Sequence, residues 1–333
     1  MKKVQYVALI SAFGLALTAC NAEGTAPEPG PEMGNAQPVA SPEQPDPTGE
    51  VHEFEDIIDL DQTGDTLGVR TADKLTIGTI DEITDGTAKA FPVDDTCTDV
   101  SASADKFVIA CGKQVRVVDG KNEEAFTLEE PVQSAAITST GELIAVSGDS
   151  AKAWVYKGGE KIDSFAVAHR SDSVFAVQHD DGQPDSVVRY NRENTTIQDI
   201  DWENGRQGGT LRVGIGIGQA VAGPDGLVLA ADAQGSQLAV YTTGQVIRLQ
   251  QMAPVAESPW AVAWDSSRDL AWVGSTAENI AVGYDISNGV PQKRYSVNTV
   301  PDALHMATLD DGSLVFASAS GAGLQIIPTD QIK

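Results

Sequence analysis

The feature that most constrains this chain is an internal repeat. A short apolar stretch, a polar turn with Asp or Gly, and a second apolar stretch rich in Val, Leu and Ala return about every 41 residues, the period of a four-stranded blade. Clear copies begin at Gln133, Gly218, Pro259 and Asp302, and weaker copies begin at Ile57, Thr98 and Asp172. One unit cannot bury both of its faces alone, so the units must pack side by side around a ring.

The remainder of each unit predicts two further strands. A third strand follows the hairpin, as in AKAWVYK from Ala151 and NIAVGYD from Asn279. A glycine-containing turn then leads to a fourth strand, as in KIDSFAV from Lys161. Apolar and polar residues alternate in these stretches, and no long amphipathic helix interrupts them. The sequence therefore predicts an all-β fold, a seven-bladed β-propeller.

The two ends of the repeat region predict how the ring closes. The last unit has only three strands and ends at Gly323–Pro328, whereas a spare strand, Gly49–Phe54, precedes the first unit. We expect the spare strand to complete the last blade, because this pairing leaves no long sheet edge exposed. Six or eight blades remain alternatives, because the stretch Asp185–Val213 is irregular.

Two of the three cysteines lie within one repeat. Cys97 and Cys111 flank the hairpin turn near Ala104, and a pair of cysteines in an exported protein favours a disulfide. We predict that this bond joins the open end of the hairpin. A redox role is the alternative, although the pair lacks the CxxC spacing of redox sites.

The N-terminus has the pattern of an export signal. Lys2 and Lys3 precede an apolar run, Val7 to Leu17, that is too short to span a bilayer as a stable helix. The run ends in Leu-Thr-Ala-Cys, which resembles the bacterial lipobox, where cleavage before the cysteine follows lipidation of its thiol. We predict a lipoprotein signal peptide over 1–19 and acyl chains such as palmitate on Cys20. An ordinary signal peptide with a chance cysteine is the alternative.

Composition separates a stalk from a folded head. Residues 20–50 are rich in Pro and Glu and offer little to bury, so we predict a disordered stalk there and the propeller over 51–333. The formal net charge of the whole chain is −26. Such a charge repels phosphate backbones, so nucleic acid is a poor candidate partner. Cations, basic protein surfaces and neutral ligands stay possible.

The repeats resemble those of the YVTN and NHL-like propellers of bacterial surface proteins. Units of that kind read roughly P-x-x-V-A-x-(S/T)-x-D-G, an apolar strand, V-x-V-(Y/D), a Gly turn and a final V-G. Matching positions are Pro259, Ala261, Val262, Pro224, Asp225, Gly226, Val240, Tyr241, Val213 and Gly214. The signature Asn is absent, and Asp232 or Gly274 stands near its place. The resemblance implies extracytoplasmic binding or scaffolding, and the lipobox and acidic stalk look like those of actinobacterial lipoproteins.

A search for chemistry gives no catalytic set. The four histidines are scattered singly, and no G-x-S-x-G elbow or Ser, His and acid grouping is evident. We predict no metal site. Paired carboxylates, such as Asp310 and Asp311, would suit calcium, but turn chemistry explains them as well.

The candidate ligand-binding residues come from the starts of the repeats. They are Trp260, His305, Asp302 and Asp172. We expect His305 to lie on an innermost strand, where it could face the channel; a hydrogen-bonded packing role is the main interpretation and catalysis the alternative. Trp260, Trp264 and Trp272 concentrate in one blade, where an interblade core is the main interpretation and a stacking surface for a sugar or peptide is the alternative.

Three functions follow from these features. The leading hypothesis is a monomeric, non-catalytic binding or scaffold protein, lipid-anchored outside the cell membrane, that recognises an envelope protein or a cell-surface ligand. A lactonase-like hydrolase that uses a channel-bound divalent ion is the second hypothesis. Capture of a glycan or another small ligand by the Trp-bearing blade is the third.

Overall fold

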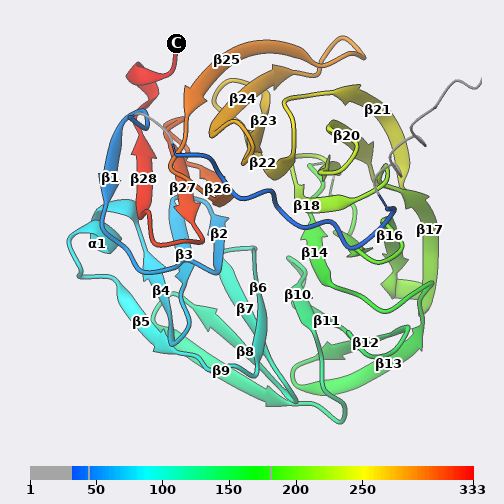
Figure 1. The fold of residues 1–333 in the computed structure, drawn as a ribbon. Helices are drawn as coiled ribbons and strands as arrows, with labels where there is room; N and C mark the ends of the chain where they lie inside the picture. The colour runs from blue at the N-terminus through cyan, green and yellow to red at the C-terminus, as the bar shows by residue number, and fades with distance from the viewer. Residues whose placement is uncertain (1–31, 44–45, 181) are drawn as a thin grey trace, which may run out of the picture. The chain divides into compact units, whose positions relative to one another are not determined.

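Seven four-stranded antiparallel sheets surround a common axis in the computed structural model, which describes residues 32–43, 46–180 and 182–333 (Figure 1). Each sheet is one blade of a β-propeller. The predicted fold class and blade number are confirmed. The predicted signal peptide and the predicted lipidation site, Cys20, lie outside the described residues.

The first four blades follow one another along the chain. Blade 1 contains β2 (Asp59–Thr63), β3 (Thr66–Arg70), β4 (Lys74–Gly78) and β5 (Lys89–Pro92). Blade 2 contains β6 (Cys97–Ser103), β7 (Lys106–Cys111), β8 (Gln114–Asp119) and β9 (Asn122–Thr127). Blade 3 contains β10 (Ser134–Ile137), β11 (Glu142–Val146), β12 (Lys152–Lys157) and β13 (Glu160–Ala166). Blade 4 contains β14 (Ser173–Val177), β15 (Ser186–Asn191), β16 (Thr196–Asp201) and β17 (Arg206–Arg212).

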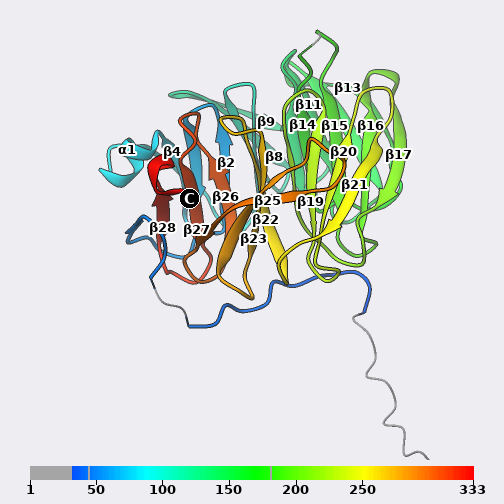
Figure 2. The same ribbon diagram turned by 90° about the horizontal axis from the view of Figure 1, so that it is seen from above.

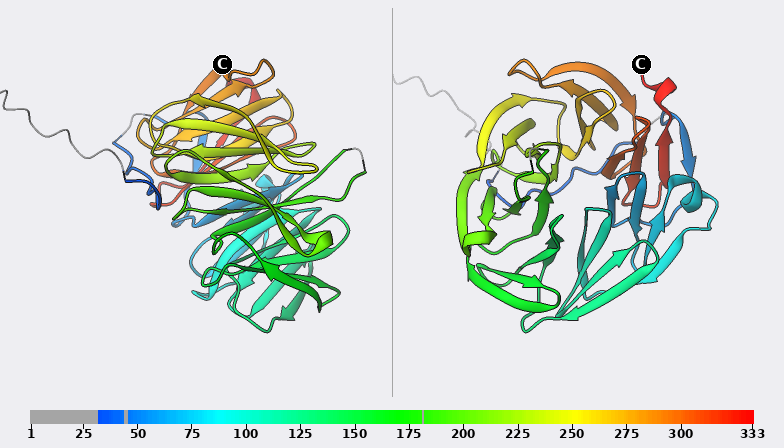
Figure 3. Two further views of the ribbon diagram at one scale, coloured as in Figure 1. Left: turned by 90° about the vertical axis from the view of Figure 1, so that its right-hand side faces the viewer. Right: turned by 180° about the vertical axis from the view of Figure 1, so that it is seen from behind.

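The remaining blades complete the ring. Blade 5 contains β18 (Ile217–Ala222), β19 (Leu227–Asp232), β20 (Gln237–Thr242) and β21 (Arg248–Pro254). Blade 6 contains β22 (Pro259–Asp265), β23 (Leu270–Ser275), β24 (Ile280–Asp285) and β25 (Gln292–Asn298). Blade 7 contains β26 (Ala303–Thr308), β27 (Leu314–Ser318), β28 (Leu324–Ile327) and, as its outer strand, β1 (Glu50–His52). The first strand of each blade lies nearest the axis (Figure 3).

The ring closes between the two ends of the propeller, as predicted. Strand β1 pairs antiparallel with β28, and Val51 is opposite Gln325 in the register. The Gln325 side chain is fully buried and donates to the carbonyls of Thr48 at 2.6 Å and Asn298 at 2.8 Å. Asn298 of blade 6, Gln325 of blade 7 and Thr48 of the N-terminal segment therefore meet where the ring closes.

Apolar contacts between neighbouring blades hold the ring together. Among the described residues, each pair of adjacent blades shares one buried cluster. Trp272 of blade 6 and Phe316 of blade 7, for example, are both 0% exposed and belong to the same cluster. Burial of one such side chain contributes about 1.5–3 kcal/mol. The alternating apolar residues of the repeats therefore fill the interfaces between blades.

Helical structure is confined to short connections in the described residues. Helix α1 (Ile80–Thr84) joins β4 to β5, and the 3-10 turns η1 (Trp202–Asn204) and η2 (Thr329–Gln331) follow β16 and β28. Thr79 and Glu82 form a reciprocal capping box at the start of α1. Within the ranges given above, no helix combines the length and the apolar character needed to cross a bilayer.

The predicted disulfide is present. Cys97 of β6 is directly opposite Cys111 of β7, and a bond joins the two sulfur atoms. We expect replacement of both cysteines by Ser to lower the free energy of unfolding by about 3 kcal/mol, because the bond restricts the unfolded chain. Urea titration measures this loss, and reductant should destabilise the native protein equally. An unchanged unfolding midpoint in both experiments would contradict the prediction.

One segment of the predicted stalk has an ordered position on the ring. Residues 33–43, which we call the strap, cross one face of the propeller before the chain reaches β1 (Figures 1 and 2). We call this side the strap face. The opposite side carries the turns between the first and second strands of the blades, and we call it the turn face (Figure 2).

Candidate functional site

The strap lies across the mouth of the central channel. The N–H of Gly34 donates to the carbonyl of Ile215 at 2.8 Å, and the N–H of Asn35 donates to the carbonyl of Arg192 at 2.9 Å. Ala36 is 1% exposed and packs in one cluster with Trp260 and Ala233. These contacts fix the first half of the strap over blades 4, 5 and 6.

The second half of the strap is held by reciprocal hydrogen bonds. The N–H of Ser41 donates to Oδ1 of Asp302 at 2.9 Å, and the N–H of Asp302 donates to Oγ of Ser41 at 2.7 Å. Ser41 Oγ also donates to the carbonyl of Thr276, and the buried Asn279 amide donates to the carbonyl of Pro42 at 2.8 Å. Polar groups of blades 6 and 7 therefore recognise this part of the strap.

Gly34 gives a direct test of the strap contacts. Its φ is +96°, and a Cβ atom built there would lie 2.1 Å from the carbonyl oxygen of Glu193. We expect Gly34→Val to detach the strap, because the side chain overlaps the backbone and the left-handed conformation is strained. Cleavage within residues 33–43 during limited proteolysis should become about 10-fold faster.

The matched control for this test is Val39→Ala, since Val39 lies in the strap but is 51% exposed. We expect cleavage at the native rate in the control and little change in the unfolding of the ring in both variants. Equal cleavage rates in Gly34→Val and the native protein would show that the strap is not fastened through these contacts.

The channel below the strap opens into a cavity of about 360 Å³, which we call the channel cavity. Ala36 and Gln37 of the strap form part of its wall. Carboxylates outnumber guanidinium groups among the described residues of its lining. These charged residues are Asp59, Asp61, Asp99, Asp172, Arg70 and Arg192.

Asp61 and Asp99 come from the innermost strands of blades 1 and 2. Burial raises the pKa of both carboxyl groups well above its usual value, and the Asp59 carboxylate raises both further. The Oδ2 atoms of both residues are shielded from solvent and have no hydrogen-bond partner. The lining of the cavity therefore contains two unfilled acceptors, an arrangement that costs stability.

The other carboxylates of the cavity are already bound. Oδ1 of Asp59 accepts from the N–H of Leu60 at 3.1 Å, and Oδ2 of Asp59 accepts from the N–H of Val100 at 3.3 Å. The Gln219 amide lies 2.8 Å from Nδ1 of His305, and Oδ1 of Asp59 lies 3.2 Å from the same ring nitrogen. Asp172 Oδ2 accepts from the N–H of Arg192 at 2.7 Å and from the Asn191 amide at 3.1 Å. These contacts position the side chains around the mouth. Among the described residues of the lining, the unpaired carboxylate oxygens are Oδ2 of Asp61 and Oδ2 of Asp99, and Asp99 also forms a side-chain hydrogen bond with Ser134.

Arg192 organises the aromatic side of the cavity. Its guanidinium lies 5.2 Å from the ring centre of Tyr190 and 5.7 Å from that of Trp260, within the range of cation–π contacts. Its Nη2 also donates to the carbonyl of Gly218 at 3.1 Å. The two aromatic rings are therefore already in contact with a cation from the chain itself.

The structure brings three of the four predicted ligand-binding residues to the channel cavity. Trp260, His305 and Asp172 line it, whereas Asp302 holds the strap. The sequence analysis did not identify Asp61 and Asp99. The alternation of Asp59 and Asp61 on an innermost strand was an available signal, since residues two apart face the same side.

Another contact joins a serine and a histidine that the sequence did not associate. Oγ of Ser186 lies 2.8 Å from Nε2 of His179, while Oδ1 of Asp225 lies 4.0 Å from Nδ1 of the same ring. The second distance is too long for a hydrogen bond. Neither Ser186 nor His179 lines the channel cavity. The pair joins the first two strands of blade 4, so we assign it a packing role.

The acidic pairs considered for calcium lie apart from the channel cavity. Asp180 and Asp310, each from one of these pairs, line the other mouth of the channel on the turn face, together with Asp225, which belongs to no pair. Within the described part of the chain, no three His, Cys, Asp or Glu side chains form a group that would hold a metal ion.

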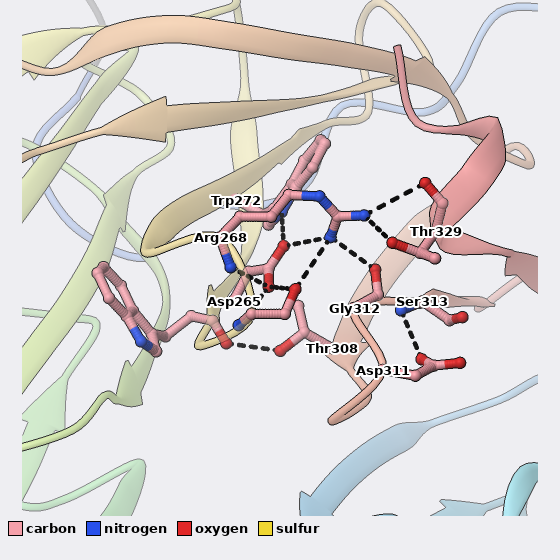
Figure 4. A network of polar contacts seen from close by, with 10 residues as sticks. Asp265, Arg268, Trp272, Thr308, Asp311, Gly312, Ser313 and Thr329 are labelled. Atoms are coloured by element: carbon pink, nitrogen blue, oxygen red, sulfur yellow. Dashed lines mark hydrogen bonds and ion pairs between the residues drawn. The ribbon is translucent and has the colours of Figure 1, made fainter.

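A polar network joins blades 6 and 7 next to this mouth (Figure 4). Asp265 is 0% exposed and accepts from Nε1 of Trp272 at 3.1 Å and from Nη1 of Arg268 at 2.8 Å. Arg268 donates onward to the carbonyl of Gly312 at 2.8 Å and also binds Thr329 in η2. Trp272 is therefore an interblade core residue, as the main interpretation predicted, while Trp264 lines the channel.

Comparison with known proteins gives the fold and no family. No family model matches the chain, and no curated protein matches it. A chain of a mitotic checkpoint complex structure is 12% identical with a TM-score of 0.66, over 96% of this chain and 99% of that chain. The WD40 β-propeller domain of Doa1 is 13% identical with a TM-score of 0.59, over 84% and 95%.

A hydrazine synthase structure from Kuenenia stuttgartiensis shows the same level of similarity. It is 14% identical with a TM-score of 0.62, over 86% of this chain and 97% of that chain. At such identities the likeness concerns the fold alone, and one fold serves many unrelated functions. The resemblance to YVTN and NHL-like repeats stays a prediction. The chain is a seven-bladed β-propeller.

Proposed function

We propose that this chain is a lipid-anchored, extracytoplasmic propeller that binds a protein partner through its turn face without catalysing a reaction. The observation that carries the proposal is the strap, because it occupies the opposite face with hydrogen bonds and a buried alanine. The lipobox-like sequence before Cys20 supports the location outside the cell membrane.

The charge of the turn face favours a basic partner. The turns that connect first and second strands carry exposed carboxylates at Asp65, Asp105, Asp225, Asp310 and Asp311. The basic side chains at these turns are already paired, since Arg268 binds Asp265 and Lys106 lies 3.8 Å from Asp119. A partner surface rich in Lys and Arg would be steered to this face and bind less well at high salt.

Two variants test the proposal separately. Cys20→Ala should abolish the incorporation of labelled palmitate into the protein, because the thiol that carries the acyl chain is lost. Asp225→Asn combined with Asp310→Asn should weaken partner capture by purified protein, whereas Asp149→Asn on the strap face should not. Palmitate incorporation equal to that of the native protein would refute the anchor, and equal capture by all variants would refute the turn-face site.

A further inference from the structure

Residues that line the channel cavity carry both hydrogen-bond acceptors and a hydrogen-bond donor that have no partner. Oδ2 of Asp61 and Oδ2 of Asp99 are buried acceptors without a partner, and Nε of Arg70 is a buried donor without a partner. Arg70 is only 6% exposed and lines the cavity, where its Nη2 donates to the carbonyl of Cys97. Buried polar groups in folded proteins are normally hydrogen-bonded, so three unfilled groups around one cavity point to a ligand.

The charges define which end of a ligand each group would bind. Oδ2 of Asp61 and Oδ2 of Asp99 offer acceptors to a cation. Asp59 and Asp172 already accept hydrogen bonds from other groups of the chain. Arg70 offers an N–H to an acceptor. A primary ammonium group has three N–H donors and suits two carboxylates, and a carboxylate suits the guanidinium.

Other cations fit less well. The described residues form no group of three ligands for a metal ion. A quaternary ammonium group would need an open aromatic face, but Arg192 already occupies Trp260 and Tyr190. The volume of about 360 Å³ is at the small end of the usual range for ligand sites.

We propose that the channel cavity binds a small zwitterion of the amino-acid type, with its ammonium group on Asp61 and Asp99 and its carboxylate on Arg70. The strap forms one wall of this site through Ala36 and Gln37. The proposal goes beyond the partner role and does not rest on the lipid anchor or on the turn face.

Binding should release protons. Burial, followed by the Asp59 charge, raises the pKa of Asp61 and Asp99, and an ammonium ion bound between the two carboxyl groups would favour their charged forms and so lower that pKa again. The other charged side chains around the pair are Arg70, Arg192 and Asp172, and the imidazole of His305 also lines the cavity. Affinity should therefore increase with pH as the two acids lose their protons.

Calorimetry with defined probes tests the site. We expect 4-aminobutanoate to bind more tightly than butylamine, and butanoate not to bind. The heat of binding should differ between two buffers of different ionisation enthalpy, because protons are released. Asp61→Asn and Asp99→Asn should each lower the affinity for 4-aminobutanoate by about 10- to 100-fold, because each variant loses one charge-assisted hydrogen bond. Arg70→Gln should remove the preference for 4-aminobutanoate over butylamine.

Stability measurements separate a binding role from a structural one. Each Asn variant removes an unsatisfied buried carboxyl group, so its melting temperature should equal or exceed that of the native protein. The matched control, Asp65→Asn on the turn face, should leave the affinity unchanged. Four results would overturn the proposal. The first two are no binding of either amine at about 10 mM and equal heats of binding in the two buffers. The other two are affinities that Asp61→Asn and Asp99→Asn leave unchanged and lower melting temperatures in both variants.

Discussion

Replacing Asp265 with Ala should lower the free energy of unfolding by about 3–5 kcal/mol, the usual cost of breaking a buried ion pair by removing one partner. Arg268 and the indole N–H of Trp272 would lose their shared acceptor, as would the backbone N–H groups of Ser267 and Arg268. The network also ties blade 6 to Gly312 and Thr329 (Figure 4). Urea titration followed by tryptophan fluorescence measures the loss.

The control for this prediction lies in the same turn. Asp269 is exposed and has a φ of +54°, a conformation that Asn tolerates, so Asp269→Asn should change stability by less than about 0.5 kcal/mol. A loss below about 1 kcal/mol in Asp265→Ala would contradict the network's role.

Removing the closing strand should have the second large effect. A chain that begins at Glu55 lacks β1, so β28 becomes an exposed edge and the buried Gln325 amide loses the Thr48 carbonyl. We expect a loss of about 3 kcal/mol in unfolding free energy and concentration-dependent association through the free edge. Thermal unfolding and sedimentation measure the two effects.

A chain that begins at Asp46 is the matched control, because it lacks the strap and retains β1. This chain should remain monomeric, and its unfolding temperature should be close to that of the native protein. If both truncated chains unfold at the same temperature as the native protein, β1 does not contribute to closing the ring.

The fold was predictable because its signal is periodic. Each repeat places apolar residues such as Trp272 and Phe316 where adjacent blades meet, and the three-stranded last unit required a partner strand. The disulfide was predictable from the same repeat, since Cys97 and Cys111 are opposite each other in one hairpin.

The strap was not predictable from composition. Its segment is rich in Pro and polar residues, as in a free stalk, but a few specific contacts fix it to the ring. Gly34 fits because a side chain would overlap the Glu193 carbonyl, and Ser41 matches Asp302 from the far end of the chain. Contacts between residues so distant in sequence follow no local pattern.

The channel cavity was predictable only in part. His305 and Trp260 were singled out as residues near the channel, and both line it. Asp99 was missed because an isolated aspartate on a strand gives no sign of its surroundings, and the alternation of Asp59 and Asp61, although an available signal, was not used. The fold of blades 1 and 2 brings Asp61, Asp99 and Arg70 together around the channel cavity, and the sequence does not show this arrangement.

Photo-crosslinking in the cell envelope tests the central claim most directly. A crosslinking amino acid is placed at Asp225 on the turn face or at Asp149 on the strap face, both exposed positions. The account predicts one reproducible protein adduct from position 225, weakened by high salt, and none from position 149. Adducts from position 149 alone, or none from either position, would contradict a partner site on the turn face.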